Sequence, residues 1–301
     1  MASYVNTNVS SLNAQRRLTN VTNSLNTTYQ RLSSGLRINS AKDDAAGLQI
    51  SDRLTAHING FNQGNRNAAD GIALAQTAEG AMDEITNMAQ RMRTLAVQSS
   101  TGTLTADDRQ AINDEFVALK NEIQRIACAT TYAGAQILRG SSSKGGLIAD
   151  SANSTLGLSA GQVNVHVGSM SVIDTETSTR GFSNKITLEF SQDMSDTALM
   201  ANIKVSTASD AEKAIATLDT ALKTVDSARS KLGAAQNRLE STMRNQSSIS
   251  ENLSDARSRI RDTDYAEEAS NLSQQSIIQQ AASSMLTQAN ARPQIALSLL
   301  G

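Results

Sequence analysis

The side chains that most often carry out chemistry in proteins are sparse in this 301-residue chain, and they do not fall at catalytic spacings. Its two histidines, His57 and His166, lie far apart in the sequence, and neither belongs to an HExxH metal-binding pattern. No P-loop and no GxGxxG phosphate-binding loop occurs in the printed sequence. We therefore expect no enzyme, no metal site and no cofactor.

Two carboxylate pairs, Asp43/Asp44 and Asp262/Asp264, come closest to an acid–base pair or a cation site. Capping is the commoner use of Asp beside a helix start, because its side chain accepts backbone N–H groups there. The single cysteine, Cys128, cannot form a disulfide within the chain, and we interpret it as a small hydrophobe rather than a reactive thiol. These residues favour a structural role.

Composition favours long helices. Aromatic residues make up 3% of the chain and there is no Trp, whereas compact cores depend on bulky rings. Pro293 is the single proline, so nothing before it blocks a long helix.

Charge and hydropathy argue against several partners. The net charge is −2, and no basic tract or interleaved aromatic platform occurs, so we expect no nucleic acid partner. No run approaches the roughly 20 apolar residues that span a bilayer, so we expect no membrane segment. The start, MASYVNTNVSSLNAQRRL, lacks a basic region followed by an apolar one. Export would therefore need a route without a cleaved signal.

Three long segments carry apolar residues at alternating spacings of three and four, which predicts helices that each bury one stripe. The first helix covers most of residues 43–100, about 80 Å at about 1.5 Å per residue. Gly102 separates it from the second, with Thr105 as N-cap, and Ser209 with Glu212 forms a capping-box pattern before the third. The stripes are Met82, Ile85, Ala89, Met92, Ala96; Ile112, Phe116, Leu119, Ile123, Ile126; and Ile215, Leu218, Leu222, Val225, Leu232, Leu239.

The middle of the chain differs in kind. From Gly140 to Ser206 the helical pattern stops and Gly, Ser and Thr dominate. The runs QVNVHV (162–167) and KITLEF (185–190) alternate apolar and polar residues, which predicts strands of a small sheet or hairpin against the helices. A separate minimal domain is the alternative, disfavoured because the segment is poor in large apolar residues.

Both ends of the chain carry thin apolar seams. Each is too narrow and too polar to hold a lone helix, so the ends are either frayed tails or helices that pair and complete their burial against other copies. The seam residues are Leu18, Val21, Leu25, Thr28 and Leu32 near the N-terminus, and Ile278, Ala282, Met285 and Ala289 near the C-terminus.

Helix-breaking residues separate each terminal seam from the long helices. In RLSSGLRINSAKDDAAGLQIS (31–51), Gly35 and Asn39 let the backbone leave one helix before Ser40 and Asp43 start the next. ARSRIRDTDYAEEASNL (256–272) makes the reverse passage, with Asp264 suited to cap the last helix. The two stretches predict a joint, made of two chain segments, between an inner and an outer helical layer.

Several longer motifs resemble those of a known protein family. QRLSSGLRINSAKDDAAGLQIS, NRNAADGIALAQTAEGAMDEI and QRMRTLAVQSS, with ARSRIRDTDYAEEASNLSQQSIIQQAASSMLTQANARPQIALSLLG at the far end, closely resemble bacterial flagellin. The resemblance covers about the first 140 and last 95 residues in the family's order. The family's outer domains normally lie between these blocks, so the chain resembles a short form that lacks large outer domains.

The resemblance implies a mostly α fold: a long antiparallel helical rod, coiled-coil-like, with a small β-hairpin region and terminal helices that pair as an inner coiled coil. It implies the inner core from 1–42 and 257–301, and the rod from 43–140, 207–256 and the β-rich segment 141–206 that completes it.

The implied function is structural. The chain would be exported unfolded and polymerise into the extracellular flagellar filament for swimming, its ends ordering on assembly. Implied partners are other copies, an export chaperone, the filament cap and hook-associated junction proteins. A hook–filament junction protein and a secreted helical effector or adhesin are the alternatives.

One surface motif has a second implied role. QRMRTLAVQ resembles the patch that vertebrate flagellin-sensing Toll-like receptors bind, which carries over to Arg91, Leu95 and Glu115. Arg91 and Leu95 are four residues apart, so we expect a charge beside an apolar anchor on one helix face. Thr94 stands where the family often has an acidic residue. The other interpretation is that all three serve subunit packing.

Overall fold

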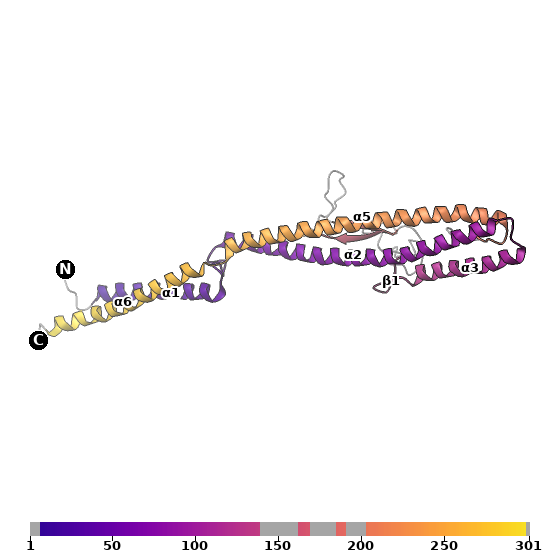
Figure 1. Ribbon diagram of the computed structural model, residues 1–301. Helices are drawn as coiled ribbons and strands as arrows, with labels where there is room; N and C mark the ends of the chain where they lie inside the picture. The colour runs from indigo at the N-terminus through magenta and orange to yellow at the C-terminus, as the bar shows by residue number, and fades with distance from the viewer. Residues whose placement is uncertain (1–6, 139–161, 169–184, 191–202, 299–301) are drawn as a thin grey trace, which may run out of the picture. The chain divides into compact units, whose positions relative to one another are not determined.

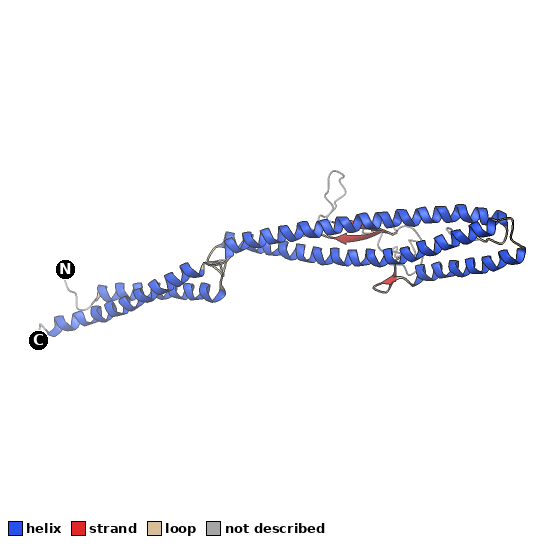
Figure 2. Ribbon diagram, in the orientation of Figure 1, coloured by secondary structure: helices blue, strands red, loops and turns tan. Residues whose placement is uncertain are grey.

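The computed structural model describes residues 7–138, 162–168, 185–190 and 203–298. Helices dominate these residues (Figure 2), as the sequence predicts. They are α1 (Val9–Ser34), α2 (Ala45–Ser100), α3 (Ala106–Ala129), α5 (Ala208–Arg261) and α6 (Tyr265–Ser298). Most of the Gly/Ser/Thr-rich segment between α3 and α5 lies outside the described residues.

Within the described ranges, two small antiparallel strand pairs accompany the helices. β1 (Thr131–Tyr132) pairs with β2 (Ala135–Gln136), and β3 (Gln162–His166) pairs with β4 (Lys185–Glu189). Both predicted strands are confirmed. Their alternating apolar residues are the buried ones: Val165, Val167, Ile186, Leu188 and Phe190.

The chain divides into two compact units. Unit 1 contains residues 1–56 and 251–301, and unit 2 contains residues 57–250. The division falls inside α2 and α5, whereas the predicted domain limits stand near the helix breaks. The inner-core and rod roles of the segments stay predictions.

Unit 2 has the main hydrophobic core, built from α2, α3, α5 and the β3–β4 hairpin. On α5 the large apolar residues Leu218, Val225, Leu232 and Leu239 alternate with small ones at spacings of three and four. The intervening positions are alanines, which the sequence analysis left out: Ala214, Ala221, Ala228 and Ala235. Large residues on one helix and small ones between them let neighbouring helices pack closely.

Polar pairs between α2 and α5 keep one antiparallel register through unit 2. From each pair to the next, the residue number on α5 falls by as much as the residue number on α2 rises. The pairs are Asn62–Ser250 (3.5 Å), Asn65–Ser247 (3.3 Å), Asp83–Arg229 (3.1 Å) and Arg93–Asp219 (2.7 Å).

Two glycines on α2 make room for the hairpin. A Cβ at Gly64 would lie 2.5 Å from the carbonyl oxygen of Val167, and one at Gly71 would lie 2.8 Å from Cγ2 of Val165. Gln246 Nε2 donates to that same Val167 carbonyl. The hairpin therefore lies directly on the backbone of α2.

The helix starts follow cap chemistry. Thr105 and Asp108 form a complete capping box at α3, which confirms Thr105 as N-cap. Arg109 then donates to the Ser99 carbonyl (3.0 Å) and the Thr101 carbonyl (2.9 Å), closing the turn after α2.

The predicted capping box at the start of α5 is wrong by two residues. Thr207 takes the cap: its hydroxyl accepts the Asp210 N–H at 3.1 Å and donates to the Asp210 carboxylate at 2.7 Å. The Thr207 carbonyl already accepts the Ala211 N–H at 2.9 Å. Ser209 and Glu212 therefore lie inside the helix, because an equally good Thr-x-x-Asp pattern precedes them.

Candidate assembly interface

The terminal helices α1 and α6 run side by side within unit 1 (Figure 1). Polar groups join them at both ends. Asn8 Nδ2 donates to the Ala289 carbonyl (2.7 Å), Ser11 Oγ to Asn290 Oδ1 (2.6 Å), and Thr28 Oγ1 to Gln275 Oε1 (3.3 Å). Pairing of the two ends with each other, rather than fraying, is what the structure shows.

Burial along α1 is thin, as its seam predicts. Over 26 residues, α1 has two buried side chains, Leu25 and Thr28. The other predicted seam residues, Leu18, Val21 and Leu32, are half-buried. The pair of helices therefore encloses little apolar surface of its own.

The predicted seam residues on α6 differ in how far they are buried. Ala289 is buried and Ala282 half-buried, but Ile278 and Met285 keep 42% and 66% of their surface exposed. Gln275 also faces α1, where its Oε1 accepts the Thr28 hydroxyl. Ile277, Ile278 and Met285 are therefore exposed in the single chain, whereas Leu272 and Leu286 are half-buried.

A groove follows the α1–α6 pair, with a volume of about 900 Å³. It is lined by apolar side chains from both helices and by polar ones: Ala14, Val21, Ile278, Ala281, Ala282, Met285, Ala289 and Ala291, with Ser10, Asn13, Arg17, Asn20 and Gln288. Five of the nine predicted seam residues thus line this one groove: Val21, Ile278, Ala282, Met285 and Ala289.

The joint predicted near Gly35 lies within unit 1 and is a set of backbone bonds between two chain segments. Gly35 has a φ of 71°, and its N–H donates to the Arg31 carbonyl to end α1. The Thr263 N–H donates to the Gly35 carbonyl (3.0 Å), and the Arg37 N–H donates to the Arg261 carbonyl (2.7 Å).

Asn39 and Asp43 hold the turn that follows. Asn39 Nδ2 donates to the Ser34 hydroxyl at 2.8 Å. One oxygen of Asp43 accepts the N–H groups of Asn39 (3.1 Å) and Ser40 (2.9 Å) and the Ser40 hydroxyl. These bonds, first that from the Ser40 backbone, lower the pKa of Asp43 below its ordinary value of 3.8.

The expectation that Ser40 and Asp43 start the second helix is wrong, because Asp43 is occupied by its own turn. The neighbouring Asp44 caps α2 by accepting the Gly47 N–H at 2.9 Å. On the other segment, Asp264 accepts the N–H groups of Ala266 (2.8 Å) and Glu267 (3.4 Å) and so caps α6.

Tyr265 is a joint residue that the sequence analysis missed. A Cβ at Gly35 would lie 2.8 Å from the Tyr265 hydroxyl, so the ring covers the end of α1 at close range. The signal available was weak: one of four tyrosines, placed at a helix start.

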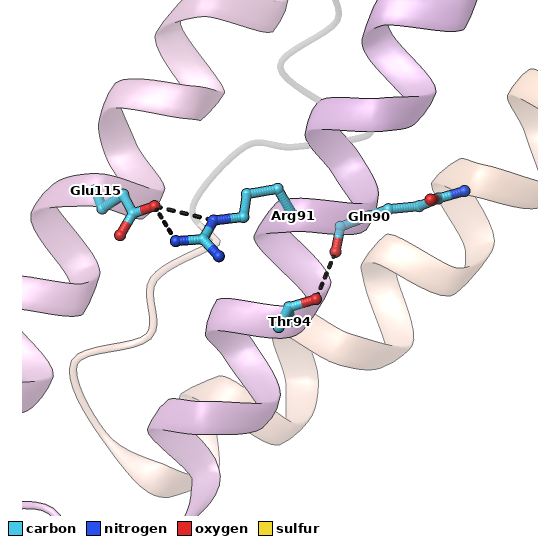
Figure 3. Close-up of polar contacts among 4 residues, drawn as sticks. All are labelled: Gln90, Arg91, Thr94 and Glu115. Carbon is cyan, nitrogen blue, oxygen red and sulfur yellow. Dashed lines mark hydrogen bonds and ion pairs between the residues drawn. The ribbon is translucent and has the colours of Figure 1, made fainter.

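The predicted receptor patch places an exposed ion pair between α2 and α3 within unit 2. Arg91 donates to Glu115 Oε1 through Nε (3.1 Å) and Nη2 (2.8 Å) (Figure 3). The Thr94 hydroxyl donates a hydrogen bond to the Gln90 carbonyl one turn earlier.

Leu95, which the sequence analysis places beside Arg91 as an apolar anchor, is buried. Leu95 keeps 2% of its surface exposed and belongs to the core of unit 2. A four-residue step does not fix the helix face when the buried stripe is wide enough to include Met92, Leu95 and Ala96.

The remaining candidate chemistry is dispersed. Within the described residues, no three His, Cys, Asp or Glu side chains gather as they would to hold a metal ion. Cys128 is half-buried in α3. In the same part of the chain, no helix combines the length and apolar character that crossing a bilayer requires.

Comparison with known proteins decides the family. Residues 5–143 match the bacterial flagellin N-terminal helical region, and residues 215–300 match the bacterial flagellin C-terminal helical region. Polar flagellin F of Vibrio parahaemolyticus is 37% identical over an alignment of 378 positions that covers 100% of both chains. The chain belongs to the bacterial flagellin family.

Other flagellins show where the similarity is concentrated. Flagellin B of Vibrio cholerae is 36% identical over 376 positions, with 100% of both chains covered. Flagellin A of Vibrio cholerae is 60% identical over 141 residues, which are 47% of this chain and 37% of that one. The crystal structure of Bacillus cereus flagellin is 26% identical with a TM-score of 0.46, covering 60% of this chain and 88% of that one.

As a flagellin, the chain is a subunit of the extracellular filament of the bacterial flagellum, the polymer of swimming motility. The family membership favours this role over a junction protein or a secreted effector. It also implies a structural rather than an enzymatic protein.

Proposed function

We propose that this flagellin polymerises through the α1–α6 pair, whose helices complete their burial against the same helices of neighbouring copies. The supporting observation is where large apolar side chains are exposed. Two of those the structure describes, Val97 and Val117, belong to unit 2, and the others all belong to unit 1: Val9, Leu12, Tyr29, Ile50, Tyr265, Ile277, Ile278 and Met285.

The energetics favour coupling between ordering and assembly. Fixing a residue costs about 1–2 kcal/mol of conformational free energy. Burying a Leu or Ile side chain returns about 1.5–3 kcal/mol, and α1 buries few such groups within its own chain. Neighbouring subunits supply the missing burial, so the terminal helices become fully ordered in the same event that adds a subunit.

A point substitution in the groove tests this proposal. Ile278→Asn puts a polar side chain into the groove, and Gln274→Asn introduces the same residue at an exposed polar position of α6. Purified subunits are added to filament fragments, and electron microscopy measures filament length. We expect Gln274→Asn to elongate like wild type and Ile278→Asn to elongate at least about tenfold more slowly.

Filaments of Ile278→Asn as long as those of wild type would overturn the proposal. Deletion of residues 1–30 is the stronger form of the test, because it removes most of α1. A truncated subunit that still forms full-length filaments would contradict assembly through the chain ends.

We propose the same partition that the sequence predicts: an inner core from 1–42 and 257–301 and a surrounding rod from 43–140, 141–206 and 207–256. The joint of Gly35, Asn39, Asp43 and Asp264 would link the two layers. The backbone bonds between its two segments support this role, since they tie the N-terminal and C-terminal passages together.

The other family partners are also proposals. An export chaperone would bind α6, where Ile277, Ile278 and Met285 are exposed to water before assembly. The filament cap and the hook-associated junction proteins would meet the same terminal helices at the two ends of the polymer. Light scattering of the subunit with and without its chaperone tests the first: we expect the chaperone to suppress association, and Ile278→Asn to weaken its binding.

Recognition of the monomer by a flagellin-sensing Toll-like receptor is a second proposed function. The exposed Arg91–Glu115 pair supports it, with side chains 56% and 46% exposed. Leu95 would act only by holding α2 in place. Arg91→Ala should lower the signal of a receptor reporter assay, whereas Arg125→Ala, which breaks the comparable Arg125–Glu122 pair on α3, should not. Equal activity of Arg91→Ala and wild type would contradict it.

A further inference from the structure

Methionines are distributed unevenly between the two units. Among the described residues, Met82 and Met92 keep 3% and 0% of their surface exposed, and Met88 and Met243 pack partly buried against the same core. Met285 on α6 is 66% exposed. The one freely accessible thioether in the described part of the chain therefore lies on the proposed assembly surface.

The neighbourhood of Met285 makes its oxidation state matter. Met285 shares its groove with Ile278 and Ala282 from α6 and with Val21 and Ala14 from α1. Conversion of a thioether to a sulfoxide replaces a flexible apolar side chain by a polar one. A sulfoxide that enters this groove must give up its hydration on burial.

We propose that Met285 is an oxidation site that controls polymerisation: its sulfoxide blocks addition of the subunit, and the assembled filament protects it. The inference rests on the proposed assembly through α1 and α6. The reaction is an oxygen-atom transfer from a peroxide. A sulfur lone pair of Met285 forms the S–O bond as the O–O bond breaks, the sulfur is oxidised to the sulfoxide, and hydrogen peroxide is reduced to water.

The test compares wild type with three variants. Met285→Leu keeps an apolar side chain that peroxide does not oxidise, Met285→Gln is permanently polar, and Met82→Leu removes a buried thioether. Monomers are treated with hydrogen peroxide, peptide mass spectrometry measures sulfoxide at each methionine, and elongation from untreated filament fragments is followed by sedimentation.

We expect peroxide to oxidise Met285 before Met82 and to slow elongation of wild type and Met82→Leu by about tenfold or more. Met285→Leu should elongate equally well before and after treatment. Methionine sulfoxide reductase should restore elongation of oxidised wild type. In assembled filaments, Met285 should be oxidised at least about tenfold more slowly than in monomers.

Oxidised wild type that elongates like untreated protein would overturn the inference, as would Met285→Leu losing elongation on treatment. The result with Met285→Gln separates this failure from that of the proposed function. If Met285→Gln elongates normally while Ile278→Asn does not, a polar group at 285 is tolerated and only the oxidation inference fails; if both variants elongate normally, the proposed function fails as well. If Met285→Gln fails to elongate while oxidised wild type succeeds, only the oxidation inference is overturned.

Discussion

Glycines on the two longest helices differ in what surrounds them. Gly64 and Gly71 face the hairpin at distances that exclude a Cβ, whereas Gly80 on α2 and Gly233 on α5 have no atom within 4 Å of a Cβ position. The first two are required by packing within unit 2. The open pair lower helix stability without any contact inside the chain that requires them.

Gly64→Ala and Gly80→Ala are a matched pair for this distinction. Gly64→Ala should destabilise unit 2 by about 1–3 kcal/mol, because the backbone of Val167 must move. Gly80→Ala should stabilise it by up to about 1 kcal/mol through helix propensity. Urea unfolding followed by circular dichroism measures both, and equal effects of the two substitutions would contradict the packing of the hairpin on α2.

The cap of α3 gives a second prediction at the residue scale. Thr105→Ala removes the hydroxyl that accepts the Asp108 N–H and should cost about 1 kcal/mol of unfolding free energy. Thr94→Ala removes a hydroxyl that bonds only within its own helix and is the control, expected to change stability by less than about 0.5 kcal/mol. Thermal unfolding of both variants decides; an unchanged melting temperature for Thr105→Ala would count against the capping box.

At the element scale, the sequence predicts most of the helices and both longer strands, because each unit 2 element buries a stripe against its own chain. The break at Gly102, the Thr105 cap and the pairing of β3 with β4 follow from local chemistry. The predicted start of α5 was wrong by two residues, and Leu95 is buried rather than available beside Arg91. At the start of α5, Thr207 and Ser209 both offered a capping pattern, and the earlier one caps the helix. The burial of Leu95 depends on how wide a stripe α2 packs against its neighbours, which its spacing from Arg91 does not report.

The orientation of α6 could not be predicted for a different reason. Two of its large apolar residues, Ile278 and Met285, keep 42% and 66% of their surface exposed within the single chain. An apolar sequence pattern indicates which residues are buried in the assembled state. It does not indicate whether the same chain or another copy buries them. Under our proposal, the exposed apolar side chains of α6 contact other subunits.

The joint has a pH dependence that follows from Asp43. Its folded-state pKa is lowered below 3.8, chiefly by the N–H groups of Ser40 and Asn39. The stabilisation it gives is therefore complete above the unfolded pKa of about 4 and is lost as pH falls through the lower folded pKa. Asp43→Asn should weaken the joint at neutral pH, and the difference from wild type should shrink on acidification.

Amide chemical shifts give a local measurement of this effect. In wild type, the N–H signals of Asn39 and Ser40 should titrate with a midpoint below 3.8, and the titration should be absent in Asp43→Asn. A midpoint at or above 3.8 would show that these two hydrogen bonds do not hold the carboxylate.

At the scale of the whole molecule, the two units differ in how completely they bury themselves. Unit 2 closes a continuous core that runs from Ala68 to Leu239 in sequence. Unit 1 joins α1 and α6 through a few polar bonds, and among the described residues it holds most of the exposed large apolar side chains. This difference is what a polymer subunit needs: one part that folds alone and one part that is completed by its neighbours.

Hydrogen–deuterium exchange of monomer and filament tests this claim most directly. We expect amides of α1 and of α6 to exchange rapidly in the monomer and at least about a hundredfold more slowly in the filament. Amides between Met82 and Met92, in the core of α2, should be protected in both states. If α1 and α6 are already as protected in the monomer as this part of α2, their folding does not depend on assembly and the account is contradicted.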